Sequence, residues 1–206
     1  MDRKILICLI MIQVFLISCL NMNDPKSQVD FIDCRDSYDS TLVRFIPKKI
    51  PNNMISFSIS SLGNLSGEED NTGIDLTIKI TNNEKYIEIK KQYLKQAKFI
   101  GISQDSCLLV IRTNCEINSE YNNSNKCEQL VPVPQYTIYE IHDSIKDRRI
   151  ERDKQIIILD FASGDFAKRK TLKQRKDLPV KWNNGYSTGI TANDKEQTIM
   201  YWLIVW

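Results

Sequence analysis

The sequence predicts an α+β domain with a mostly antiparallel sheet, one or two helices, disulfide bonds and a three-stranded meander at its C-terminal end. Three observations carry this prediction. Residues 74–80 alternate between apolar and polar side chains, residues 83–98 place apolar side chains at helical spacing, and residues 198–206 are apolar on both faces.

Several short segments read as strands because they alternate or form brief apolar runs between turn residues. Residues 83–98 are ambiguous, because Ile87 and Ile89 also fit a strand, but we favour a helix capped by Asn82 or Asn83. The prolines of 131–134 predict a stiff extended linker, 61–73 a loop, and 144–154 a short charged helix or loop. The predicted strands are 41–46, 54–60, 74–80, 99–103, 107–113, 136–141 and 155–161.

The C-terminal end gives the clearest pattern. Asn184-Gly185 separates 178–182 from 186–192, and Asn-Gly is the strongest two-residue hairpin signal. A second turn at 193–196 then leads into 198–206. Because this last strand is apolar on both faces, we expect it to be central, with a helix such as 83–98 on one face and a second layer or partner on the other.

The N-terminal end predicts export and anchoring. Arg3 and Lys4 precede an apolar run over 5–16, which is well short of the roughly 20 residues of a transmembrane helix. The sequence Leu16-Ile17-Ser18-Cys19 then resembles the lipobox of bacterial lipoproteins. The resemblance implies that 1–18 is a signal peptide and that Cys19 is lipidated; the alternative is a plain signal peptide cut near Ser18 or Cys19.

This resemblance also orders the rest of the chain. In such lipoproteins, an Asp directly after the lipidated cysteine often means retention at the inner membrane. This sequence has Leu20 at that position, so the outer membrane is favoured over the inner. We predict a flexible tether over 19–30 and a single domain over 31–206, which would divide near 131–134 if it has two parts. The mature chain has a net charge near +1, which does not suggest nucleic-acid binding.

Cysteine arithmetic favours disulfides. Cys34, Cys107, Cys115 and Cys127 stay in the mature domain, and an even number in an oxidising compartment allows three pairings. We favour Cys115–Cys127 across a polar, turn-rich loop, together with Cys34–Cys107. A zinc site is disfavoured because no Cys-x-x-Cys occurs and the only histidine, His142, is remote in sequence. No metal or other cofactor is expected.

The search for catalytic motifs is mostly negative. His142 lies in no nucleophile motif. Asp160 and Asp165 follow a buried strand and form the best candidate pair for a hydrolase, but Asp, Ser and Gly at these positions fit a turn better. We therefore expect no enzyme, and assign no catalytic residue.

A basic run is the main candidate for binding. It contains no acid and no interleaved aromatic residue, so it suits an acidic protein, an anionic glycan or lipid headgroups better than single-stranded nucleic acid. A solvated surface without a partner explains it equally well. The run consists of Lys168, Arg169, Lys170, Lys173, Arg175 and Lys176.

These features together suggest a membrane-anchored binding protein of the cell envelope with a protein partner, in one form an inhibitor or immunity-type lipoprotein. A structural or assembly lipoprotein is the first alternative. A hydrolase using Asp160 and Asp165 is the second.

Overall fold

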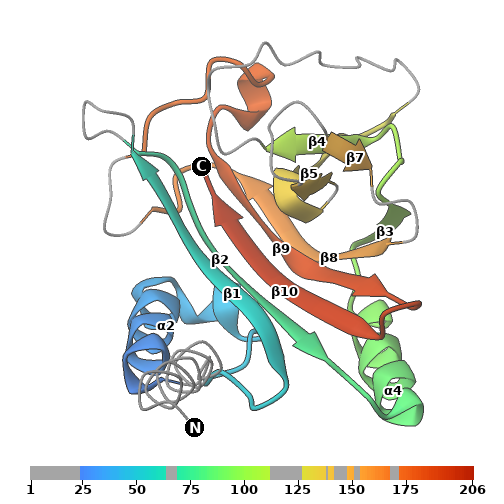
Figure 1. Ribbon diagram of the computed structural model, residues 1–206. Coiled ribbons are helices and arrows are strands. Elements are labelled where there is room, and N and C mark those ends of the chain that lie inside the picture. The colour runs from blue at the N-terminus through green and yellow to red at the C-terminus, as the bar shows by residue number, and fades with distance from the viewer. Residues whose placement is uncertain are drawn as a thin grey trace, which may run out of the picture.

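A six-stranded antiparallel sheet forms the centre of the computed structural model, in the order β1-β2-β10-β9-β8-β3 (Figure 1). The structure describes residues 24–63, 69–111, 127–137, 139–141, 148–150, 154–167 and 172–206. The sheet strands are β1 (Met54–Gly63), β2 (Glu69–Lys79), β3 (Phe99–Ile102), β8 (Lys154–Ser163), β9 (Gly185–Asn193) and β10 (Thr198–Val205).

Layers lie on both sides of this sheet (Figure 1). The helices α2 (Pro25–Ser37), α3 (Ser40–Val43) and α4 (Asn83–Leu94) pack on one face. The other face meets β4 (Leu108–Ile111), β5 (Val131–Pro134) and the 3-10 helix η2 (Val180–Trp182). A second 3-10 helix, η1 (Gln135–Thr137), and a small sheet of β6 (Tyr139–Ile141) and β7 (Arg148–Ile150) complete the described elements.

The last strand is central and buried on both faces, as its sequence predicts. Its odd-numbered side chains, Ile199, Tyr201, Leu203 and Val205, join the core beneath the helices. Its even-numbered side chains pack on the opposite side: Trp202 and Met200 against the β5 region, and Ile204 and Trp206 against β4 and η2.

Both tryptophans of this end are buried with their indole nitrogens bonded. Trp202 donates to the Thr191 hydroxyl at 3.1 Å, and Trp206 donates to the Trp182 carbonyl at 2.8 Å. Gly189 makes room for Trp202, because an added Cβ would lie 2.7 Å from the indole and 2.5 Å from the Ile157 carbonyl oxygen. Gly185 makes room for Trp206 in the same way, because an added Cβ there would lie 2.8 Å from its indole, so the packing of this face depends on two glycines.

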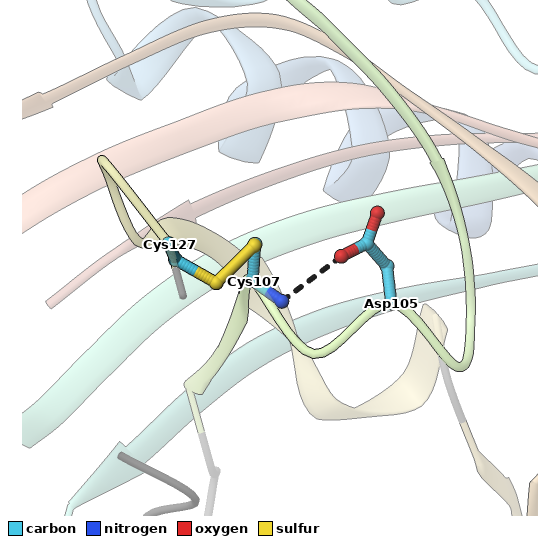
Figure 2. Close-up of a disulfide and its surroundings, with 3 residues drawn as sticks. All are labelled: Asp105, Cys107 and Cys127. Atoms are coloured by element: carbon cyan, nitrogen blue, oxygen red, sulfur yellow. Dashed lines mark hydrogen bonds between the residues drawn. A yellow bond between two sulfur atoms is a disulfide. The ribbon is translucent and has the colours of Figure 1, made fainter. Parts of the chain in front are cut away.

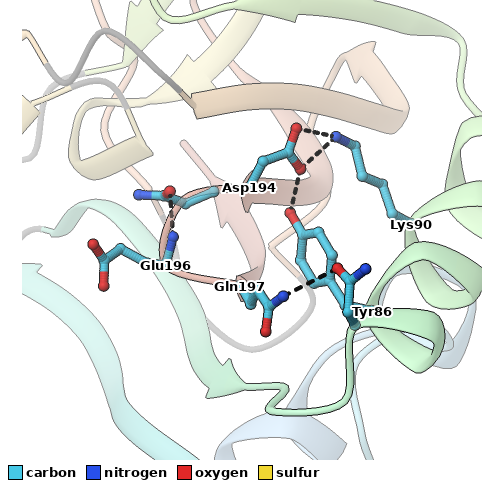
Figure 3. Close-up of polar contacts among 7 residues, drawn as sticks. Tyr86, Lys90, Asp194, Glu196 and Gln197 are labelled. Carbon is cyan, nitrogen blue, oxygen red and sulfur yellow. Dashed lines mark hydrogen bonds and ion pairs between the residues drawn. The ribbon is translucent and has the colours of Figure 1, made fainter.

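Helix α4 confirms the helix predicted over 83–98 in part, because it begins at Asn83 but ends at Leu94. The Asn82 side chain accepts a hydrogen bond from the Lys85 amide at 2.8 Å and caps the helix. At the turn between β9 and β10, Asp194 accepts bonds from the Tyr86 hydroxyl and the Lys90 amine, each at 2.6 Å (Figure 3). The neighbouring Gln197 amide donates to Asn83 at 3.0 Å. Helix and turn are thus held together by polar contacts as well as by the core.

The prediction of a strand over 41–46 is wrong. Asp39 accepts bonds from the amide and the hydroxyl of Thr41, at 2.9 and 2.8 Å, and starts the short helix α3 instead. Leu42, Val43 and Ile46 are all buried. These positions lie one, three and four residues apart, which is the spacing of one face of a helix. The prediction treated this spacing as the alternation of a strand.

The flexible tether predicted over 19–30 is also too long. Helix α2 begins at Pro25, and the Asp24 side chain caps it by accepting from the Lys26 amide at 2.6 Å. An Asp N-cap followed by proline at the first helical position is a strong helix start. Residues 19–23 lie outside the described part of the chain.

The meander has different members from those predicted. Residues 180–182 form η2, not a strand, and the Trp182 amide bonds to the Pro179 carbonyl at 2.6 Å. Asn184-Gly185 therefore does not join two strands; β9 begins at Gly185 itself. Three successive strands do run antiparallel at this end, but they are β8, β9 and β10.

Other predicted segments differ from the structure in type or in length. The proline segment Val131–Pro134 is not a linker but β5, which pairs in parallel with β4. Within 144–154, residues Arg148–Ile150 form β7. The predicted loop over 61–73 is shortened by β1 and β2. Of the strand predicted over 136–141, residues 136–137 belong to η1 and residues 139–141 form β6.

A disulfide joins Cys107 to Cys127 (Figure 2). Parallel pairing of β4 with β5 brings these residues together, since Leu108 lies opposite Val131 and the Val131 amide bonds to the Cys107 carbonyl at 2.9 Å. The favoured pairs Cys115–Cys127 and Cys34–Cys107 are therefore wrong. Cys34 is half-buried on α2 against the core, and Cys115 lies outside the described residues.

Tryptic peptide mapping without reduction tests this pairing. Cleavage after Lys98, Arg112 and Lys126 places Cys107, Cys115 and Cys127 on three separate peptides. We expect the peptide over 99–112 to be linked to the peptide that begins at residue 127. A link between 113–126 and the latter would contradict the structure. Closure of this loop should stabilise the fold by roughly 3 kcal/mol.

Burial of Asp75 makes stability depend on pH. Burial raises its pKa to about 6, from an ordinary value of 3.8, against the lowering effect of hydrogen bonding with Ser58. The folded state therefore holds a proton that the unfolded state has lost. The stabilisation is full below the lower pKa and is lost as pH rises through about 6.

Asp75→Asn should remove this loss. We expect the variant to unfold at a higher temperature than the wild type at about pH 8, with the advantage vanishing near pH 4; the effect is on the order of 3 kcal/mol. Thermal melts across this pH range measure it. Asp33→Asn removes an exposed carboxyl group from α2 and serves as the control. Equal pH profiles for wild type and Asp75→Asn would refute the account.

Candidate functional site

Two adjoining pockets lie on the helical side of the sheet, between α3, α4 and the strands β8 and β9; together we call them the helix-side groove. Their volumes are about 410 and 400 Å³, and Thr41 lines both. The first is also lined by Arg44, Phe45, Gln92, Tyr93, Gln96, Leu159, Asp160 and Thr188. The second is also lined by Asp39, Leu42, Asp165, Phe166, Ala167 and Tyr186.

A β-bulge in β8 shapes the floor of the first pocket. Ile158 pairs with Gly189 and Asp160 pairs with Thr188, so Leu159 is the extra residue. Side chains normally alternate between the two faces of a strand, and a bulge interrupts this alternation. Leu159 and Asp160 therefore both line the groove, although they are consecutive in sequence.

Asp160 is ionised and fully engaged. Its carboxylate accepts from the Lys98 amine at 2.5 Å and from the Phe161 amide at 2.9 Å. Burial raises the pKa of Asp160, but hydrogen bonds from Lys98 and Tyr186 outweigh it and leave the pKa below its ordinary value. A general acid needs a pKa near the operating pH, so this environment suits a fixed charge better than proton donation.

Tyr186 shares this environment. Burial, followed by its hydrogen bond to Asp160, raises the pKa of the phenol to about 12. Its ring meets Phe166 edge-on, with the centroids 4.5 Å apart. The phenol is therefore protonated at neutral pH and connects the two pockets through packing and a hydrogen bond.

Asp165 takes part in a turn, as the simpler interpretation of this segment predicts. Its carboxylate accepts from the Ala167 amide at 3.1 Å, just after Gly164, whose φ of 136° favours glycine. Asp160 and Asp165 line different pockets of the groove. The structure thus places the two candidate acids in one groove but does not present them as a pair facing one site.

Arg44 is the exposed cation of the first pocket. It ends α3, and no hydrogen bond or ion pair joins its guanidinium to another residue in the described part of the chain. Lys98, the other nearby cation, is neutralised by Asp160. The first pocket thus offers one unpaired positive charge among the hydrogen-bonding side chains of Thr41, Gln92 and Gln96.

The predicted basic run is only partly on the surface. Lys173 and Lys176 are exposed, whereas Lys168, Arg169 and Lys170 lie outside the described residues. Arg175 is only 2% exposed, and its guanidinium makes two bonds to Asp177, at 2.8 and 2.7 Å. Its inclusion in an exposed patch is therefore wrong, because a bidentate carboxylate partner lets the charge be buried. Binding by the other five residues stays a prediction.

Other predicted sites have no described environment. Cys19 and His142 both fall outside the described residues. Within the described ranges, no group of three or more ligating side chains is placed to hold a metal ion. Over those same ranges, every helix is too short or too polar to cross a membrane.

Comparison with protein-family models, with curated proteins and with solved structures found no match.

Sequence reasoning missed Arg44, Gln92 and Gln96 as site residues. Arg44 lies in a segment predicted as a strand, and the two glutamines lie within the predicted helix, where no motif marks them as site residues. The Asp39 cap was the one local signal that could have placed Arg44 at a helix end.

Proposed function

We propose that the protein is a lipid-anchored binding protein of the cell envelope, and that the first pocket of the helix-side groove receives an acidic side chain of a protein partner. The lipobox ending at Cys19 supports the anchor, and Leu20 supports an outer-membrane location. One observation carries the binding site: Arg44 lines the first pocket and is unpaired within the described structure, whereas the acid of that pocket, Asp160, is already paired with Lys98.

Recognition would combine charge with directed hydrogen bonds. A carboxylate can pair with the guanidinium fork of Arg44 through two parallel bonds. Thr41, Gln92 and Gln96 line the same pocket and supply further donors and acceptors. Electrostatic pairing of this kind contributes mainly to specificity and to the rate of association.

The state of Asp160 favours binding over catalysis. Its charge is balanced by Lys98, and its pKa is lowered rather than raised toward neutral pH. Asp165 is occupied by a turn. An inhibitor or immunity-type lipoprotein fits such a groove, whereas a structural lipoprotein would meet many envelope components instead of one.

Affinity capture from the native host tests the proposal. The C-terminal residue Trp206 is buried and its backbone bonds to Gly185, so a C-terminal tag would disturb the fold. A tag inserted within residues 20–23 lies between the anchor and helix α2 instead. Proteins retained in mild detergent are then identified by mass spectrometry, and one dominant species at near-equal amount is expected.

Arg44→Glu should weaken capture of that partner by about tenfold or more, because it replaces attraction by repulsion. Lys48→Glu is the matched control, since it reverses an exposed charge four positions away and outside the groove. Quantitative capture and equilibrium titration measure both variants. If both variants lose partner binding equally, or if Arg44→Glu loses none, the groove is excluded as the binding site.

The hydrolase alternative is separated by a turnover assay on the captured partner. If partner processing occurs and is abolished by Asp160→Asn with Asp165→Asn, the protein is an enzyme and the binding proposal is wrong.

A further inference from the structure

Strand β1 forms one margin of the central sheet and pairs with β2 on one side only (Figure 1). Among the described residues, no strand pairs with its other side. Every edge strand presents a row of backbone N–H and C=O groups that can pair with another strand. At ten residues, β1 offers a long row of this kind.

This edge lacks the usual chemical protection. Natural proteins guard edge strands with lysine, other charges, proline, short length or bulges. The sequence of β1, Met-Ile-Ser-Phe-Ser-Ile-Ser-Ser-Leu-Gly, holds no charge and no proline. The opposite edge is guarded differently, because β3 spans only four residues and follows Lys98 directly.

Bulges do occur in β1, but only at its ends. Register shifts lie between Met54 and Ser56 and between Leu62 and Gly63. From Ser56 to Leu62 the pairing with β2 is unbroken. Seven consecutive residues therefore keep regular strand geometry, which is enough for a further strand to pair.

The two faces of β1 differ in chemistry. Phe57 points to the helical side and packs edge-on against Phe31 of α2, with the ring centroids 5.8 Å apart. Ile59 shares that face by alternation and is 40% exposed. Ser58 lies on the opposite face, where it bonds to the Asp75 carboxylate.

We propose that two copies of the chain pair through β1, antiparallel across a two-fold axis at Ser58. In this register Phe57 lies opposite Ile59 of the second copy, and Ser56 lies opposite Ser60. Cross-strand pairs of an aromatic with a β-branched residue stabilise antiparallel sheets, and like charges directly opposite destabilise them. In this register β1 has an aromatic–β-branched pair and no like charges directly opposite each other.

Self-pairing is favoured over capture of an unrelated peptide because the strand complements itself. The two-fold axis places Phe57 against Ile59 of the second copy, while the backbone bonds continue the sheet from one copy into the other. A two-fold interface of this type is the commonest in soluble oligomers. If both copies are anchored to one membrane, confinement raises their effective concentration further.

The oligomeric state of the full lipidated protein in detergent tests the inference, by sedimentation over a range of concentrations. We expect a dimer for the wild type and at least about a tenfold weaker dimer for Ile59→Lys, because the lysines introduce charge at the centre of the pairing. Ile100→Lys on β3 is the matched control: Ile100 is 48% exposed on the other edge, and this variant should dimerise normally.

Three results would overturn the proposal. These are a wild-type protein that is monomeric at every concentration, a dimer that Ile59→Lys leaves intact, and equal loss in both variants. Thermal melts confirm that each variant is folded. The first of these results includes a monomer that instead binds an extended peptide along β1. None of these outcomes depends on the groove or on its partner.

Discussion

The fold depends on the burial of β10 on both faces. A strand whose side chains are apolar on either side gains stability only when both faces are removed from water, since each fully buried large apolar side chain contributes about 1.5–3 kcal/mol. The helices cover one face, and β4, β5 and η2 cover the other. The three-layer arrangement follows from the requirement that both faces of β10 be buried.

The second layer explains several local features. Trp202 needs the space above Gly189, and Trp206 needs the Trp182 carbonyl as a hydrogen-bond acceptor. Residues 180–182 therefore help to cover one face of β10 and do not form a strand of the sheet. The Cys107–Cys127 disulfide joins the two strands of the same layer at their start, where Val131 bonds to Cys107. A covalent bond thus reinforces a small layer that has few backbone partners of its own.

Strong local patterns were enough to predict part of this structure. The alternation of 74–80, the Asn82 cap and the two apolar faces of 198–206 led to β2, α4 and β10, because each signal is decided within a few residues. The other elements depend on which segments pair or pack together in the folded chain. Nothing local shows that the prolines of 131–134 bond in parallel with β4, or that Asn184-Gly185 follows a 3-10 helix. Asp24-Pro25 and Asp39 were local signals of helix starts that the sequence interpretation overlooked.

The candidate site was less predictable than the fold, because it forms where distant segments meet. Asp160 could be selected from its place after a buried strand, but its partner Lys98 lies 62 residues away. The bulge at Leu159 turns Asp160 into the groove, and α3 supplies Arg44. The same helical layer that covers β10 thereby forms the walls of the groove, so the proposed binding surface is a consequence of how the core is closed.

Native-state hydrogen exchange at β10 tests the central claim most directly. If both faces are covered, the amides of residues 199–205 should exchange only when the whole domain unfolds, and should be among the slowest in the chain. Their free energy of opening would then equal the global free energy of unfolding measured by denaturant. Exchange of these amides through a lower-energy opening, while α4 and β2 stay protected, would show that one layer does not cover the strand and would contradict the account.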